Sequence, residues 1–378
     1  EVLDRFEQGA DAFNTWYQSR HDHLGLKADL SEADLSGRNL REYWLVDAIF
    51  DRANMQETNL QEVDMQYAEG RNTDFTNAYL EMTSMQDGNY TGAVFTDAYM
   101  RHALLNRSIG VDTTFANANL QEARLIFGDF TRANFAGADL RNCVANEARF
   151  IEADFDDADL REAYLKGSVF EDAKNLVTAR LEGVILENAD MRRLDLSDCE
   201  FFSANLKYAN FRRSTLDGAI FEGSQMFAVR FDRADLNDAD FSEANATQGD
   251  FSDAELNEAD FSEAVVTRAK FIDAEAVGVR FRRTNLERTD FEGADLTDAD
   301  FRGAYLRNVS FLDAILDGAR FQDANMEWLD LTNVDFGTAD LTGANLRQAD
   351  LAGARIDSAN QEYVMNQNIV NPGQIVWE

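Results

Sequence analysis

The hydrophobic residues of this chain recur every five positions from about Ala28 to Ser358. In each unit a small residue, usually Ala, is followed by Asp or Asn, then by Leu, Phe or Met, and then by two polar residues, as in ADFDDADLRE over residues 153–162. Side chains repeat every ~3.6 residues in an α-helix and about every 2 in a strand, so five fits neither. The pattern predicts a short extended piece followed by a tight turn, with the small and the large residue facing a common interior.

The spacing of the large residues predicts how many units complete one coil. One series runs in steps of 20 from Phe75 to Phe155, and another, of Leu or Met, from Leu40 to Leu160. Later in the chain Phe recurs every ten residues, so two of four sides should be stacked with Phe. We predict an all-β solenoid, a four-sided parallel β-helix of about 16 coils, roughly 80 Å long at about 4.8 Å per coil.

Local details of the repeat carry further predictions. Gly70, Tyr90 and Gly110 occupy one side in successive coils, so the Tyr90 ring should sit between two empty positions. Gly also recurs at the last position of the unit, where some turns require a positive φ. Residues 173–178 hold six residues in place of five, which predicts a bulge or slight bend and no domain boundary.

The two ends differ from the repeat, as a stacked structure requires. Apolar residues at helical spacing predict an N-terminal helical cap within residues 1–27: Leu3, Phe6, Ala10, Phe13, and Trp16 or Tyr17. The β-helix itself is predicted for residues 28–358. Residues 359–378 contain the only proline, Pro372, and form either a terminal cap or a docking tail.

Charge and composition restrict the class of partner. The net charge is −35, from 35 basic and 70 acidic residues, so the surface repels nucleic acid and anionic membranes and favours a basic partner. No apolar run is long enough to cross a bilayer, and we expect a cytoplasmic protein. Cys143 and Cys199 occupy the small-residue position of their units, so we interpret both as core fillers.

The repeated A(D/N)LXX and A(D/N)FXX units resemble the pentapeptide-repeat family over about seven-eighths of the chain. The opening FNTWYQSR followed by ADLSEADL is also similar to the helical lead-in of many bacterial members. The resemblance implies a right-handed, four-sided β-helix. Some family members are proposed to mimic DNA and to bind type II topoisomerases, so DNA gyrase or topoisomerase IV is an implied partner. Those members also use a projecting loop, and this repeat contains no large inserted loop.

The sequence favours a protein that is not an enzyme. A filled rod offers no concave, partly dry site, and no Ser or Cys nucleophile stands in a recognisable motif. His21, Asp22 and His23 suggest a metal site, but no Cys or further His lies at ligand spacing, so we interpret them as a solvated loop. Calcium-binding solenoids use Gly-rich nonapeptides, which this chain lacks. We therefore expect no metal and no cofactor.

Counting in steps of 20 assigns the outward residues to sides, and one side is acidic. Its central residues run from Leu196 to Phe336, and its outward positions hold no Lys or Arg. We call its carboxylates the acidic face: Asp195, Asp198, Asp217, Asp235, Asp238, Glu255, Glu258, Glu275, Asp295, Asp298, Asp317 and Asp335. Such a face presents negative charge every ~5 Å, comparable to the phosphate spacing of DNA.

The other sides carry different residue types. Six arginines between Arg192 and Arg233 fall on one neighbouring side, Arg280, Arg282 and Arg283 on another, and a series of Asn from Asn205 to Asn345 on the third. The first hypothesis is a rod-shaped module whose acidic face binds a basic protein surface. The alternative is a scaffold or spacer that forms a homodimer or assembles end to end through its terminal caps, in which case the acidic face only confers solubility.

Overall fold

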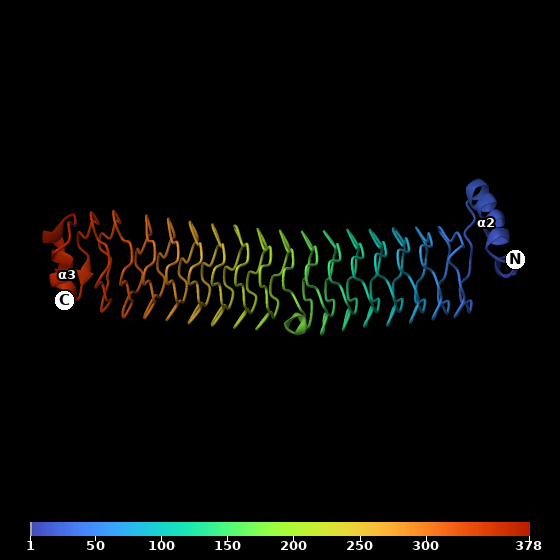
Figure 1. Cartoon of the computed structure of the whole chain (residues 1–378), viewed down its shortest axis with the longest axis horizontal. Helices are drawn as coiled ribbons and strands as arrows, with labels where there is room; N and C mark the ends of the chain where they lie inside the picture. Colours follow the sequence, from blue (N-terminus) through green and yellow to red (C-terminus); the bar gives the residue numbers. More distant parts are fainter. Residues whose placement is uncertain (1) are drawn as a thin grey trace. The chain divides into compact units, whose positions relative to one another are not determined.

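The computed structural model describes residues 2–378 and contains two compact units, Glu1–Asp190 and Met191–Glu378. The first unit contains α1 (Val2–Phe6), α2 (Ala10–Leu24) and the 3₁₀ helix η1 (Leu176–Thr178). The second ends with β1 (Arg355–Ile356), η2 (Ser358–Asn360), α3 (Gln361–Met365), η3 (Pro372–Gln374) and β2 (Val376–Trp377) (Figure 1). Within residues 2–378 no helix is both long and apolar enough to span a membrane.

Parallel backbone bridges between residues 20 positions apart build both units. Asp235, for example, bridges Thr215 on one side and Glu255 on the other. The Leu236 N–H donates to the Glu255 carbonyl at 2.7 Å, and the Glu255 N–H donates to the Ala234 carbonyl at 3.0 Å. This register places four five-residue units in each coil, which makes the structure a β-helix with few conventional helices or strands.

The interior of each unit is filled by the small and large residues that the repeat predicted. In the second unit, Phe rings 20 residues apart stack with centroids 4.5 Å apart for Phe241 and Phe261, and rings ten residues apart meet edge to face, as Phe251 and Phe261 do at 86°. Both geometries are favourable for aromatic pairs. The prediction of two Phe-stacked sides is confirmed, and Cys143 and Cys199 are buried free thiols.

The packing of Tyr90 differs from the prediction. A Cβ added at Gly70 or Gly88 would lie 2.9 or 2.6 Å from the Tyr90 ring, whereas one added at Gly110 would lie 2.7 Å from Phe130. Each ring therefore leans toward the coil that precedes it. Tyr90 takes the space of Gly70 and Gly88, and Gly110 makes room for a different ring.

The last position of the repeat unit adopts a left-handed backbone throughout. Gly218 has φ 66°, as predicted, but Asp238 and Glu258 adopt the same conformation with φ 56° and 59°. A type II turn requires a positive φ at its third residue. The turn geometry is therefore imposed on Asp, Asn, Glu and Arg as well as on Gly, which holds these side chains at the corner of the coil.

The extra residue in residues 173–178 forms one turn of 3₁₀ helix. Lys174 still bridges Asp154, 20 residues away, but Arg180 bridges Asp159, 21 residues away. Asn175 adopts φ 58° and is exposed, while Leu176 is buried and fills the interior position. The chain therefore accommodates the insertion within the first unit and resumes its register at once.

The N-terminal helices close the first coil with side chains. Phe13 and Tyr17 of α2 are buried, so Tyr17 and not Trp16 faces the core. Leu3, predicted to join them, is 46% exposed, because the predicted helix divides at Gly9, where φ is 95°. The Asn14 amide donates to the Glu42 carbonyl at 2.7 Å and accepts from the Trp44 N–H at 2.8 Å. These bonds satisfy edge groups of the β-helix.

The C-terminal segment covers the last coils of its unit. The Asn360 side chain donates to the Ala339 carbonyl at 2.9 Å and accepts from the Leu341 N–H at 3.1 Å. A bridging backbone residue makes the same pair of bonds, because Asp235 bonds the Ser214 carbonyl and the Leu216 N–H. Beyond this amide, β2 pairs in parallel with β1. The tail therefore occupies the open edge of its own sheet, as a cap does.

The buried rings predict where a substitution is costly. Replacing Phe251 or Phe271, whose rings stack at 4.7 Å, by Ala should lower the free energy of unfolding by about 3–5 kcal/mol, because each change leaves a cavity between coils. The outward Ser252→Ala should change it by less than about 0.5 kcal/mol. Urea unfolding of the three variants measures both effects. Equal losses at the two kinds of position would contradict the packing.

Candidate functional site

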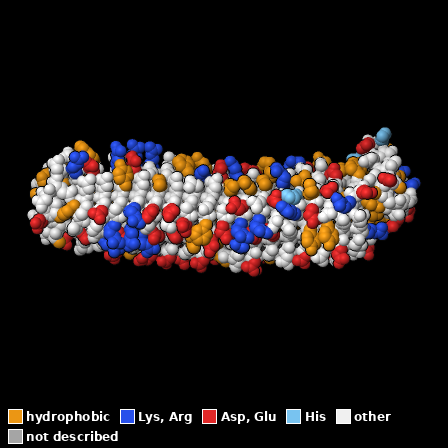
Figure 2. Space-filling view, in the orientation of Figure 1, with side chains coloured by type: hydrophobic (Ala, Val, Ile, Leu, Met, Phe, Trp, Pro, Cys, Tyr) orange, Lys and Arg blue, Asp and Glu red, His pale blue; other side chains and the backbone are white. Residues whose placement is uncertain are grey.

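The backbone register aligns the acidic face along the second unit. Asp235, Glu255, Glu275 and Asp295 form consecutive bridges, so their side chains leave the same side of successive coils. All twelve carboxylates of the face point outward; Asp235 and Asp295 are half-buried and the others exposed. In Figure 2 acidic side chains gather along the lower edge of this unit. The register thus places the predicted residues together.

Few of these carboxylates are neutralised by a cation. The Glu258 Oε2 lies 3.5 Å from the Arg280 Nη1, and the Asp335 Oδ2 lies 3.5 Å from the Arg355 Nη1. Among residues 2–378, the other ten carboxylates of the face form no ion pair with Lys or Arg. Arg355 bridges Asp335, so a basic residue ends the face at its C-terminal side. The sequence count had stopped before that residue.

Amide side chains organise the centre of the face. The Asn237 Nδ2 donates to the Asp235 Oδ1 at 2.8 Å, and the Asn257 Nδ2 donates to the Glu275 Oε1 at 3.1 Å. The Asn237 Oδ1 accepts from the Asn257 backbone N–H at 2.9 Å, which links the two amides into a ladder. These hydrogen bonds orient the carboxylates without cancelling their charge.

Crowding of like charge is measurable at one position. Burial and the neighbouring carboxylates of Asp235, Asp238 and Asp198 together raise the pKa of Asp217 above its ordinary range. The native chain therefore holds this proton more tightly than the unfolded chain. Stability contributed at this position falls as pH rises through the raised pKa, because the ionised form is repelled by its neighbours.

The basic sides are more fully paired than the acidic face. Arg212 forms an ion pair with Asp232, and the Arg233 Nε lies 3.3 Å from the Asp253 Oδ2. The Asn series is confirmed as one bridged column, with Gln225, Val265 and Tyr305 at alternate places. The sequence analysis missed a cluster of arginines around Asp300, whose signal lies in residues at steps of 18 to 20 from that aspartate.

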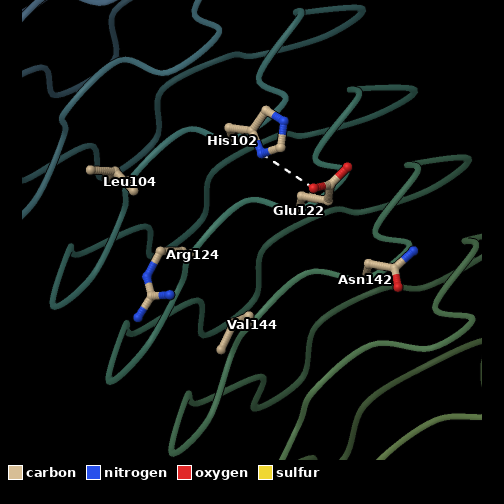
Figure 3. A pocket seen from close by; sticks show the side chains of 6 residues that line it. All are labelled: His102, Leu104, Glu122, Arg124, Asn142 and Val144. Atoms are coloured by element: carbon tan, nitrogen blue, oxygen red, sulfur yellow. Dashed lines mark ion pairs between the residues drawn. The ribbon is translucent and has the colours of Figure 1, made fainter.

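The first unit contains an open hollow of about 590 Å³. Its walls are the turn residues His102, Glu122 and Asn142 and the bridged residues Leu104, Arg124 and Val144 (Figure 3). The His102 Nδ1 lies 3.5 Å from the Glu122 Oε2. Arg101 also donates to this carboxylate at 2.6 Å and lowers its pKa, so Glu122 is held ionised by a cation and is not set as a base.

The remaining candidate residues are structural. His21 and His23 lie within α2, so the interpretation as a loop was wrong; the helix continues to Leu24 because the first coil starts only after Gly25. The His21 ring packs edge to face against Trp44. Within residues 2–378 no group of three His, Cys, Asp or Glu residues is arranged to hold a metal ion. Burial raises the pKa of Cys143 and of Cys199 to about 12.

Comparison with protein families identifies the repeat. A model described as pentapeptide repeats (8 copies) matches successive stretches within residues 28–172, and a model described as a pentapeptide repeat region matches residues 214–291 and 284–360. Together these matches cover about three-quarters of the chain. Among curated proteins, none matches this sequence.

Solved structures that match include three pentapeptide-repeat or related proteins. HetL of Nostoc sp. strain PCC 7120, described as involved in heterocyst differentiation regulation, is 21% identical over 78% of this chain and 97% of its own, with a TM-score of 0.16. Full-length QnrB1, a plasmid-mediated fluoroquinolone resistance protein, is 15% identical over 67% and 95%, with a TM-score of 0.20. A thylakoid-lumen protein of Arabidopsis thaliana is 26% identical over 32% and 73%, with a TM-score of 0.14.

The raised pKa of Asp217 predicts a stabilising substitution. Asp217→Asn should raise the free energy of unfolding at pH 7 and low salt by up to about 0.5 kcal/mol, because it removes a repelled charge. The gain should shrink in high salt and vanish near pH 3, where the carboxyl is largely protonated. Asp313→Asn, an exposed change outside the acidic face, is the control. Urea unfolding measures both; a destabilised Asp217→Asn at pH 7 would rule out the repulsion.

Proposed function

The chain belongs to the pentapeptide-repeat family, and we propose that it is a binding module, not an enzyme, whose acidic face engages a basic protein surface. The observation that carries the proposal is the row of carboxylates that remain outside ion pairs while most arginines of the same unit are paired. A solubilising surface needs net charge, but it does not need the charges aligned on one side. Aligned charges reinforce one another toward a single partner.

The chemistry of the face selects the class of partner. A net charge of −35 repels nucleic acid and anionic lipid, whereas a groove lined by Lys and Arg is attracted. Coils about 4.8 Å apart space the carboxylates along one line, as phosphates are spaced along a nucleic-acid strand. We propose DNA mimicry on this basis. A type II topoisomerase, DNA gyrase or topoisomerase IV, is the specific candidate that family resemblance suggests.

The finer architecture belongs to the same proposal. We propose that the coils are right-handed and four-sided and number about 16 in all, roughly 80 Å of β-helix at about 4.8 Å per coil. The register of 20 residues supports four sides, because each coil then holds four equivalent turns. A straight, stiff scaffold would keep the carboxylates of the face in line and would limit the entropy lost on binding.

The alternative function is a scaffold that assembles through its caps. In this case the C-terminal segment must exchange the bonds that it makes to its own last coils, among them those of Asn360, for bonds to another copy. Light scattering of the chain at low and high salt distinguishes the two functions. Concentration-dependent dimers that survive salt and charge reversal of the face would favour assembly through the caps.

Charge reversal tests the face directly. Replacing Asp235, Asp238, Glu255 and Glu258 by Lys should reduce affinity for the basic partner at least 100-fold, because attraction becomes repulsion. Binding of the unaltered chain should also weaken steeply between about 50 and 200 mM salt. A supercoiling assay with DNA gyrase and a pull-down at low salt provide the readouts.

The matched control reverses four exposed carboxylates outside the face: Glu222, Glu243, Glu292 and Asp313. It changes the net charge by the same amount and should retain most of the affinity. Gyrase supercoiling that is unaffected by excess protein would remove the topoisomerase proposal alone. Equal loss of binding in the two quadruple variants would refute the face itself and leave only a general effect of charge.

A further inference from the structure

A cluster of arginines surrounds one buried aspartate in the second unit. Asp300 is fully buried and bridges Arg280 and Arg320 in the neighbouring coils. Arg302 donates through Nε to the Asp300 Oδ1 at 2.8 Å and through Nη2 to the Oδ2 at 2.6 Å. Arg282 donates through Nε to the Oδ2 at 2.6 Å. The Arg320 Nη2 lies 3.7 Å from the same oxygen. We call Arg282, Arg302 and Arg320 the arginine cluster.

The arginine cluster has more positive than negative charge. The nearby Arg280 is paired with Asp260 and Glu258, and Arg283 with Glu263. Within residues 2–378, Asp300 is the only carboxylate in an ion pair with any member of the cluster. Three guanidinium groups therefore share one carboxylate, which leaves a local surplus of two positive charges in a chain of net charge −35.

Asp300 acts as the anchor that holds this surplus in place. Burial alone would raise the pKa of Asp300, but hydrogen bonds from Arg302 and Arg282 lower it far below its ordinary range. The carboxylate is therefore ionised at all ordinary pH values. Two arginines already satisfy it, so a stabilising role for Asp300 does not account for the third, Arg320, which makes no hydrogen bond to it.

The guanidinium groups remain accessible from outside. The side chains of Arg282, Arg302 and Arg320 are 44%, 42% and 45% exposed. Figure 2 shows Lys and Arg side chains gathered in groups on the face in view, not spread evenly. Arg302 uses two of its five donors on Asp300, and Arg320 uses none there, so N–H groups are left over to receive an anion.

We propose that the arginine cluster is a binding site for a phosphate group in its dianionic form. Its surplus of two positive charges matches the two negative charges of a phosphate above its second pKa, and the guanidinium fork matches tetrahedral oxyanions. The phosphate is either free or carried on the serine of another protein. This site lies on a different side of the coil from the acidic face and is independent of it.

Titration calorimetry at low ionic strength tests the site with two probes. One is inorganic phosphate, and the other is a phosphoserine peptide with the unphosphorylated peptide as its blank. The unaltered chain should bind at least one of the two phosphate probes, and the probe that binds identifies the source. Arg320→Gln should weaken that binding at least tenfold, and because Arg320 makes no hydrogen bond to Asp300 the variant should keep its fold, which circular dichroism checks. Arg347→Gln, which removes an exposed arginine paired with Glu327, should bind as the unaltered chain does.

A pH profile separates a dianion site from general attraction. The second pKa of a phosphorylated side chain is about 6, so binding should weaken several-fold between pH 7.5 and pH 5 while the arginines and Asp300 keep their charges. No binding of either probe at millimolar concentration, or equal binding by Arg320→Gln, would overturn the site. Phosphate binding that survives the quadruple reversal of the acidic face shows that the site stands whether or not the face binds a protein.

Discussion

The parallel backbone register of 20 residues is the constraint on which the rest of the structure depends. Each coil hydrogen-bonds to the next through main-chain groups that sequence cannot alter, so each residue stacks on the residue 20 positions away. Inside, this stacks Phe on Phe and Ala on Ala. Outside, it converts a preference at one position into a column of like side chains about 4.8 Å apart. The acidic face and the Asn column both arise in this way.

Much of the interior could be predicted because it obeys this periodicity. The two Phe sides, the buried Cys143 and Cys199 and the left-handed Gly218 follow from position in the unit alone. The terminal caps could not be predicted in the same way. Asn14 and Asn360 replace a bridging backbone with a side-chain amide, and an amide in a helix or short turn has no periodic signal. The 3₁₀ turn at Leu176 likewise resolves a choice between bulge and bend that local spacing leaves open.

The candidate sites divide along the same line. The residues of the acidic face were identifiable by counting, since all lie at equivalent positions of one side. Their pairing was not, because Arg280 reaches Glu258 from the adjacent side and Arg355 lies beyond the regular repeat. Asp300 occupies a position at which most coils carry an ordinary outward residue. Its burial follows only from the three arginines around it.

The most direct test of the account is a cysteine cross-link across one coil of the acidic face. Asp235→Cys with Glu255→Cys places two thiols on bridged residues, where Cα atoms about 4.8 Å apart permit a disulfide. Asp235→Cys with Asn245→Cys, ten residues apart, places them two sides away. The buried native Cys143 and Cys199, with pKa values raised to about 12, should stay reduced. Mass spectrometry after mild oxidation should find the disulfide in the first pair alone; a disulfide in the second pair alone would contradict the register and the acidic face together.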